Sequence, residues 1–228
     1  MKKIIAVIIS LFIILSAFAI GVGALPSETD SGILYSIENG IVTVEGFNYA
    51  GTVLDVPETI EGYPVKYVAA QACRGNYGIT EVRLPSSLVS IGEYAFAECD
   101  NLTKVVLSGG VEIGYSAFRD CKALISLSLP EGLEIIDDSA FEGCTNLGKI
   151  KLPDSVTRIG TYAFMGCERV RFSSGANDYV ISYAKDNGIP IGSDPWVMRV
   201  TVIAITSAVL LAVLLATDRA IKKRKKNK

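Results

Sequence analysis

The sequence predicts an α/β repeat protein, a right-handed solenoid of about five coils in which short strands alternate with one-turn helices. Three observations predict this fold. The pattern Ile-x-x-x-Ala-Phe-x-x-Cys recurs at residues 91–102, 113–124, 136–147 and 159–170, with starts 22 or 23 residues apart. A divergent copy lies one period earlier, at residues 68–79. Two short stretches of alternating apolar and polar residues follow each block, which is the pattern of half-buried strands.

The repeated residues also predict the core. No coil of this length can bury its apolar face alone, so the coils must stack in register. Stacking then aligns two interior columns of side chains. These columns are Phe96, Phe118, Phe141 and Phe164, and Cys99, Cys121, Cys144 and Cys167.

The beginning of the chain has the order of a secretory signal peptide, over residues 1–24. Lys2 and Lys3 precede an apolar run, and small residues follow it up to Ala24. We expect cleavage after Ala24, with Ala19 as the competing site. The alternative is an uncleaved N-terminal membrane helix.

The end of the chain predicts a membrane anchor. Residues 196–217 form an apolar run that, as a helix, is long enough to cross a hydrocarbon layer of about 30 Å. Residues 218–228 hold seven Lys and Arg, which should keep this tail in the cytoplasm. The two ends together predict a single-pass protein of the cell membrane whose repeat domain lies outside. No LPxTG-like motif precedes the apolar run, so attachment to a cell wall is not expected.

Five cysteines in an exported chain raise the alternatives of disulfides and of metal binding. In-register side chains point in parallel instead of toward each other, which disfavours a bridge between coils. The divergent copy has Asn76 in the Cys slot, which suits a buried side chain that bonds to a turn carbonyl. We therefore expect a reduced structural ladder. Without histidine or a C-x-x-C motif, neither a metal nor a cofactor is expected.

The motif I-G-x-x-A-F-x-x-C-x-x-L followed by L-P resembles the BspA-type leucine-rich repeat family of microbial surface proteins, over about residues 54–172. The resemblance implies a leucine-rich-repeat solenoid used for adhesion and protein recognition, without enzymatic activity. It divides the exported part into N-terminal capping strands at 25–55, repeats at 56–172, and a C-terminal cap and short linker at 173–195. One departure is that each cysteine precedes the Leu-x-x-Leu-x-Leu core by three residues instead of following it.

One face of the predicted strands is a candidate binding surface. Residues 25–198 hold 12 Lys and Arg against 23 Asp and Glu, a net charge of −11 that argues against nucleic acid as a partner. Strand alternation nevertheless points four cations outward on one face. They are Arg83, Lys104, Lys149 and Lys151. We expect this face to bind an acidic protein segment or an anionic glycan, and the alternative is an ordinary solvated strand face. The next candidate is the opposite strand set around Lys66, Tyr67, Glu112 and Arg158.

Three classes of function follow, in order. The first is a recognition module for a protein or glycan at the cell envelope, and the second is a structural or assembly subunit at the membrane surface. The third is a wall hydrolase that uses two carboxylates, since the absence of histidine excludes most other hydrolase mechanisms. Asp137 and Asp138 offer such a pair, but their place in a turn favours capping of a short helix. No catalytic residue is assigned.

Overall fold

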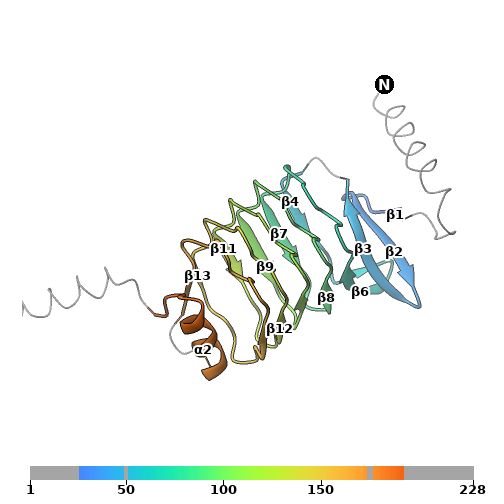
Figure 1. Cartoon of the computed structure of the whole chain (residues 1–228). Helices are drawn as coiled ribbons and strands as arrows, with labels where there is room; N and C mark the ends of the chain where they lie inside the picture. Colours follow the sequence, from blue (N-terminus) through green and yellow to red (C-terminus); the bar gives the residue numbers. More distant parts are fainter. Residues whose placement is uncertain (1–25, 49–50, 174–176, 193–228) are drawn as a thin grey trace, which may run out of the picture. The chain divides into compact units, whose positions relative to one another are not determined.

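The computed structural model describes residues 26–48, 51–173 and 177–192, and these form a solenoid closed by a helix at its C-terminal end (Figure 1). The predicted signal peptide at 1–24, membrane helix at 196–217 and basic tail at 218–228 lie outside the described residues. Within the described part of the chain, no helix has the length and apolar character needed to span a membrane.

Two rows of parallel strands run along the solenoid (Figure 1). The first row consists of β6 (Tyr63–Val68), β8 (Ser90–Ile91), β10 (Glu112–Ile113), β12 (Ile135–Ile136) and β14 (Arg158–Ile159). The second row consists of β4 (Val53–Asp55), β7 (Glu81–Leu84), β9 (Lys104–Leu107) and β11 (Ser126–Ser128), followed by the separate pair β13 (Lys149–Ile150) and β15 (Arg171–Phe172). Glu81 is in register with Lys104, and Lys104 with Ser126, so that equivalent slots of successive coils line up.

A hairpin covers the N-terminal end of the stack. It is built from β1 (Ser27–Glu28), β2 (Ile33–Glu38) and β3 (Ile41–Phe47), and β3 then joins β6 in parallel. The short β5 (Thr59–Ile60) pairs antiparallel with β6. Gly46 of β3 lies so close to the first coil that a Cβ there would stand 3.2 Å from the carbonyl oxygen of Ala72. Close contact with the first coil therefore explains why a glycine stands in this strand.

The solenoid has about six turns, whereas the sequence predicts about five. The second row contains one strand per turn, and β15 begins the additional turn. This turn escaped the repeat pattern because it lacks the Ala-Phe-x-x-Cys block. Where the block would stand, the chain forms α2 (Asp178–Asp186), which is the only helix among the described residues. This helix lies inside residues 173–195, the segment that the sequence predicts to be the C-terminal cap and linker.

The prediction of one-turn helices in the Ala-Phe-x-x-Cys blocks is wrong. These blocks are compact turns. Their backbone N–H groups donate hydrogen bonds alternately to carbonyls of the same coil and to carbonyls of the next coil. In the block of Phe96, the three N–H groups that donate to the next coil are those of Tyr94, Phe96 and Glu98, at 3.0, 2.8 and 2.8 Å. Tyr94 and Glu98 have φ of 54° and 61°, a left-handed conformation that breaks a helix. Hydrogen bonds between neighbouring coils therefore take the place of the hydrogen bonds that a helix would form within itself.

The interior holds the two columns of side chains. The rings of Phe96, Phe118, Phe141 and Phe164 are stacked at centroid separations of 5.3–5.4 Å, with interplanar angles of 6°, 2° and 11°. Phe172 closes the column edge-on against Phe164. All five cysteines are buried and free. Stacked rings and thiols thus occupy the interfaces between the coils from Phe96 to Phe164.

Candidate functional site

The outer face of the second row brings Arg83 and Lys104 together around a carboxylate. Glu81 lies 2.9 Å from the Nε of Arg83 and 2.9 Å from the Nζ of Lys104. Arg83 also contacts Asp55 of β4 at 3.3 Å. Hydrogen bonds from Lys104 and then from Arg83 lower the pKa of Glu81, so this carboxylate stays ionised between them. The positive charge expected at this end of the face is therefore compensated by Glu81 and Asp55.

The other end of the face holds three basic residues. Lys149 of β13 is the direct register partner of Arg171 of β15, which places two cations on neighbouring strands. Lys151 lies two residues further along and pairs with Glu131 at 2.8 Å, with three-quarters of its side chain exposed. Among the described residues, no carboxylate forms an ion pair with Lys149. We call Lys149, Lys151 and Arg171 the basic cluster.

Sequence reasoning missed two features of this face. It omitted Arg171, because the sixth strand of the second row was not recognised as part of the repeat. It also omitted Asp55 and Glu131, which lie outside the counted strands but reach Arg83 and Lys151. The alternation that placed the cations outward could have included Asp55, since β4 alternates like β7 and pairs with it in register.

The cysteines act as hydrogen-bond donors. Each thiol from Cys99 to Cys167 donates to a main-chain carbonyl of the preceding coil at 3.0–3.1 Å. Burial raises the pKa of Cys73 to about 12. The hydrogen bond with Cys121, followed by burial, raises the pKa of Cys99. Raised pKa values disfavour the thiolate, which is the form that attacks electrophiles and binds metals. The column therefore has the chemistry of a structural element.

The predicted capping role of Asp137 and Asp138 is wrong, because no helix begins after them. Asp138 instead accepts a hydrogen bond of 2.7 Å from the N–H of Thr161 in the next coil, and Asp137 pairs with Arg158. Both carboxylates thus tie successive coils together.

The first row of strands carries the second candidate surface. Lys66 and Tyr67 lie on β6, Glu112 on β10 and Arg158 on β14, so that the four are spread along the row and Arg158 is engaged by Asp137. Glu112 and Glu134 both line a depression of about 270 Å³ on this side. Both glutamates are exposed, whereas a general acid needs a desolvated site.

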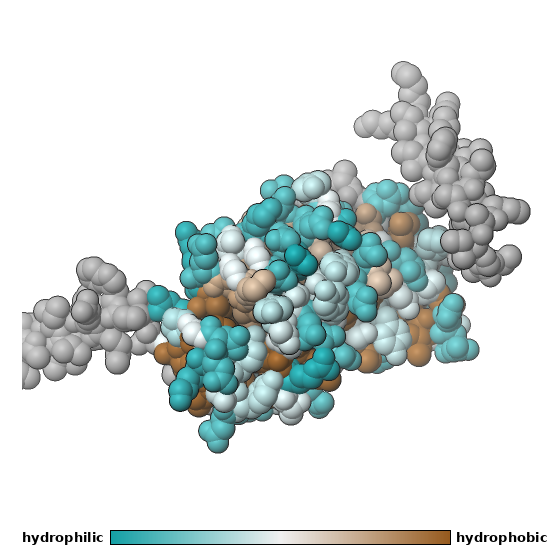
Figure 2. Space-filling model, in the orientation of Figure 1, coloured by the Kyte–Doolittle hydropathy of each residue, from teal (hydrophilic) through white to brown (hydrophobic). Residues whose placement is uncertain are grey.

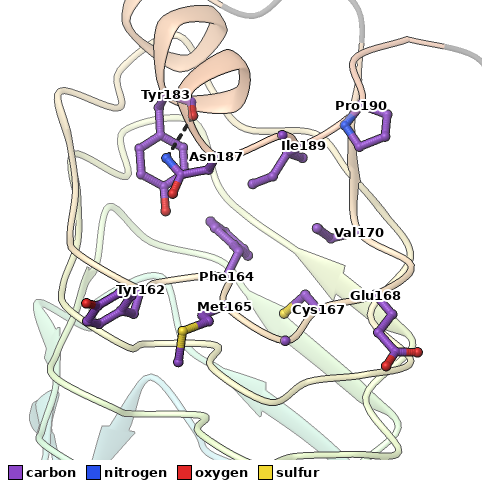
Figure 3. A pocket seen from close by; sticks show the side chains of 12 residues that line it. Tyr162, Phe164, Met165, Cys167, Glu168, Val170, Tyr183, Asn187, Ile189 and Pro190 are labelled. Atoms are coloured by element: carbon purple, nitrogen blue, oxygen red, sulfur yellow. Dashed lines mark hydrogen bonds between the residues drawn. The ribbon is translucent and has the colours of Figure 1, made fainter.

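The C-terminal end of the solenoid holds a larger cavity, of about 560 Å³ (Figure 3). The last coil supplies one wall, with Tyr162, Met165 and Gly166, and Tyr183 of α2 reaches toward it from the opposite side (Figure 3). Tyr162 and Met165 are about half exposed. Figure 2 shows hydrophobic surface at the end of the solenoid that carries α2. Nothing in the sequence pattern marked this cavity, because it arises where the repeat stops.

The stacked parallel strands, the compact turns and the Leu-x-x-Leu-x-Leu core define this protein as a leucine-rich-repeat solenoid. The sequence matches the BspA type Leucine rich repeat region in six copies over residues 59–175. The chain therefore belongs to the BspA-type leucine-rich repeat family. The six copies agree with the additional turn seen in the structure.

Two solved structures are similar to this chain. A leucine-rich repeat protein of T. pallidum is 30% identical with a TM-score of 0.60, covering 64% of this chain and 71% of that one. A leucine-rich repeat protein of Bacteroides ovatus is 33% identical with a TM-score of 0.56, covering 63% of this chain and 40% of that one. This chain thus spans less than half of the Bacteroides protein. A search of curated proteins gives no match.

Proposed function

We propose that this chain is an exported, membrane-anchored recognition module that binds a protein or glycan partner at the cell envelope. The observation that carries the proposal is the basic cluster on the second row of strands. It stands on a body whose residues 25–198 carry a net charge of −11. A local positive surface on an acidic protein attracts an anionic partner, while the net negative charge of the body opposes association with other copies of the same chain.

The strand register strengthens this argument. Lys149 and Arg171 are register partners on neighbouring strands, so the basic cluster brings together side chains from two strands of this face. We infer that an acidic protein segment or an anionic glycan binds at the basic cluster, with Arg83 and Lys104 contributing less because Glu81 already lies between them.

The other two classes of function have weaker support. A structural or assembly subunit has no need of basic side chains gathered on one strand face. A hydrolase would need two carboxylates in a cleft, and the exposed Glu112 and Glu134 line only a small depression. The family is described as a repeat region, which agrees with recognition as the main role.

Charge reversal tests the proposal. The full chain in mild detergent is applied to two resins, one carrying heparin and one carrying poly-glutamate, and eluted with salt. The variant Lys149→Glu/Lys151→Glu should elute at clearly lower salt than the wild type, because binding through ion contacts weakens as salt screens charges over about 8 to 10 Å. The control Lys122→Glu/Lys185→Glu carries the same change in net charge at exposed positions outside both candidate surfaces.

The two resins distinguish the partners. Retention on heparin alone indicates an anionic glycan, and retention on poly-glutamate alone indicates an acidic protein segment. If the control variant loses retention as strongly as the cluster variant, net charge governs binding and the basic cluster is not the site. Folding is monitored by thermal unfolding, which exposed substitutions should change by at most about 0.5 kcal/mol.

A further inference from the structure

The cavity at the C-terminal end lies where the pattern of bonds between coils stops. In each earlier block, three N–H groups at alternate positions donate to carbonyls of the next coil. In the block of Phe141 they belong to Ser139, Phe141 and Gly143, at 2.9, 2.8 and 2.8 Å. The equivalent groups of the last block belong to Tyr162, Phe164 and Gly166, and all three residues line the cavity. In the part of the chain that the structure describes, the last coil has no further coil whose carbonyls could accept hydrogen bonds from these three N–H groups.

The cap covers other parts of this end with side chains. The Tyr179 hydroxyl accepts a hydrogen bond of 2.7 Å from the N–H of Ile159, which seals the edge of the first row. Asn177 donates to the carbonyls of Asp154 and Val156 at 2.8 and 3.0 Å. On the second row, the Phe172 N–H donates to the carbonyl of Pro190 at 2.9 Å.

Of the three N–H groups of the last block, only that of Phe164 is covered by the cap. The hydroxyl of Tyr183 lies beside the Phe164 N–H, and burial raises the pKa of this tyrosine to about 12. Within the described residues, no acceptor is present for the N–H of Tyr162 or of Gly166. Tyr162 and Gly166 are exposed, so a carbonyl from outside the solenoid can reach their N–H groups.

We propose that this cavity binds an extended peptide segment of another protein, which adds a further layer to the solenoid. Its carbonyls accept hydrogen bonds from Tyr162 and Gly166, at the alternate spacing that the coils use among themselves. Its side chain is small at the position that continues the alanine column, because every earlier block places an alanine in that slot. A cavity of about 560 Å³ lies in the range of natural ligand sites.

A second copy of this chain fits the cavity less well. The carbonyls that could continue the row belong to the first block, and the one that would meet the Phe164 slot is that of Ala72. The main chain of β3 packs on this carbonyl at Gly46, so the hairpin occupies the place that another copy would need. A lipid surface also fits poorly, because hydrocarbon offers no acceptor to backbone N–H groups.

The test uses the ¹⁵N-labelled full chain in mild detergent and a capped Ala-Ser-Ala-Ser-Ala peptide as the probe. Addition of millimolar peptide should shift the amide resonances of Tyr162 and Gly166 in a saturable manner and slow their hydrogen exchange. Ser139 and Gly143 hold the same slots one coil earlier and serve as internal controls, because their N–H groups are already bonded.

Two matched variants sharpen the test. Tyr183→Phe removes the hydroxyl beside the Phe164 N–H while keeping the ring, so this N–H becomes accessible as a third donor. Peptide affinity should then rise by about fivefold, the effect of one net hydrogen bond. Tyr179→Phe removes a hydroxyl from the same helix that bonds outside the cavity, and it should leave the affinity unchanged.

Three results would overturn the proposal. The first is the absence of a saturable shift at Tyr162 and Gly166 with millimolar peptide. The second is a shift that grows with protein concentration without peptide, accompanied by dimers in sedimentation, which would assign the cavity to a second copy. The third is a shift that follows the detergent instead of the peptide, which would assign it to lipid. The lining of the cavity includes no residue of the basic cluster. Retention on charged resins therefore tests the proposed function and leaves the peptide proposal to be decided by the experiment above.

Discussion

The thiol of Cys121 donates a hydrogen bond to the main-chain carbonyl of Phe96 in the preceding coil, with a distance of 3.0 Å between sulfur and oxygen. The same relationship joins Cys144 to Phe118 and Cys167 to Phe141. Each thiol thus satisfies the backbone of a residue whose ring stacks in the neighbouring column. A small, weakly polar donor fits this buried slot, because a larger group would separate the coils.

We predict that the cysteine column resists alkylation in the folded protein. Burial shields all five thiols from the reagent, and it raises the pKa of Cys73, in the first coil, to about 12. Iodoacetamide should therefore modify the native protein slowly and modify all five cysteines after denaturation without reductant, as counted by mass spectrometry. Cysteines that become reactive in denaturant only after reduction would show that they form disulfides.

The phenylalanine column predicts an order of stabilities. Phe118 and Phe141 each stack between two parallel rings, whereas Phe164 has one stacked neighbour and edge contacts at the end of the column. Truncation of a buried aromatic side chain costs about 3 to 5 kcal/mol. Phe118→Ala or Phe141→Ala should lower the free energy of unfolding more than Phe164→Ala, as measured by urea denaturation. Equal and small losses at all three positions would contradict a cooperative buried column.

Much of the fold follows from the sequence because the repeat constrains it. The period, the strand alternation and the Phe and Cys slots all recur, so a single arrangement must satisfy every coil at once. The compact turns could not be derived in this way. Tyr94 and Ser116 adopt left-handed conformations at equivalent slots without being glycine, and the bonds to the next coil that stabilise them are invisible in one repeat.

The candidate site was predictable only in part, for the same reason. Alternation fixes which face Lys149 and Lys151 occupy, since it is a local property of strands. Their partners depend on how the chain packs beyond the repeat, as Glu131 and Arg171 show. The cavity at the C-terminal end arises where the repeat stops, so the recurring residues could not predict it.

Glu58 should make stability depend on pH in acid. Its carboxylate accepts hydrogen bonds from the N–H and the hydroxyl of Ser86, both at 2.8 Å, and from the N–H of Ser87 at 2.9 Å. These bonds, led by the Ser86 N–H, lower the pKa of Glu58 from 4.5 to about 2. A folded pKa below the unfolded value stabilises the protein above pH 4.5, and the contribution is lost as the pH falls toward 2.

The variant Glu58→Gln isolates this effect. The urea midpoint of the wild type should fall between pH 4.5 and pH 2 by more than that of Glu58→Gln, while Glu168→Gln, an exposed carboxylate on the last coil, should behave like the wild type. Parallel pH profiles for the wild type and Glu58→Gln would show that the two serine contacts do not persist in solution.

The proposed membrane topology predicts which lysines are accessible on intact cells. If the repeats lie outside and the tail inside, a membrane-impermeant lysine reagent should modify Lys185, which is exposed on α2, and spare the lysines from Lys222 to Lys228. Seven cations in the tail resist transfer across the membrane, because each charged group loses its hydration in the hydrocarbon layer. Mass spectrometry of the digested protein identifies the labelled sites, and permeabilised cells serve as the control in which both sets react. Labelling of the tail with protection of Lys185 in intact cells would reverse the orientation, and would place the basic cluster on the cytoplasmic side of the membrane.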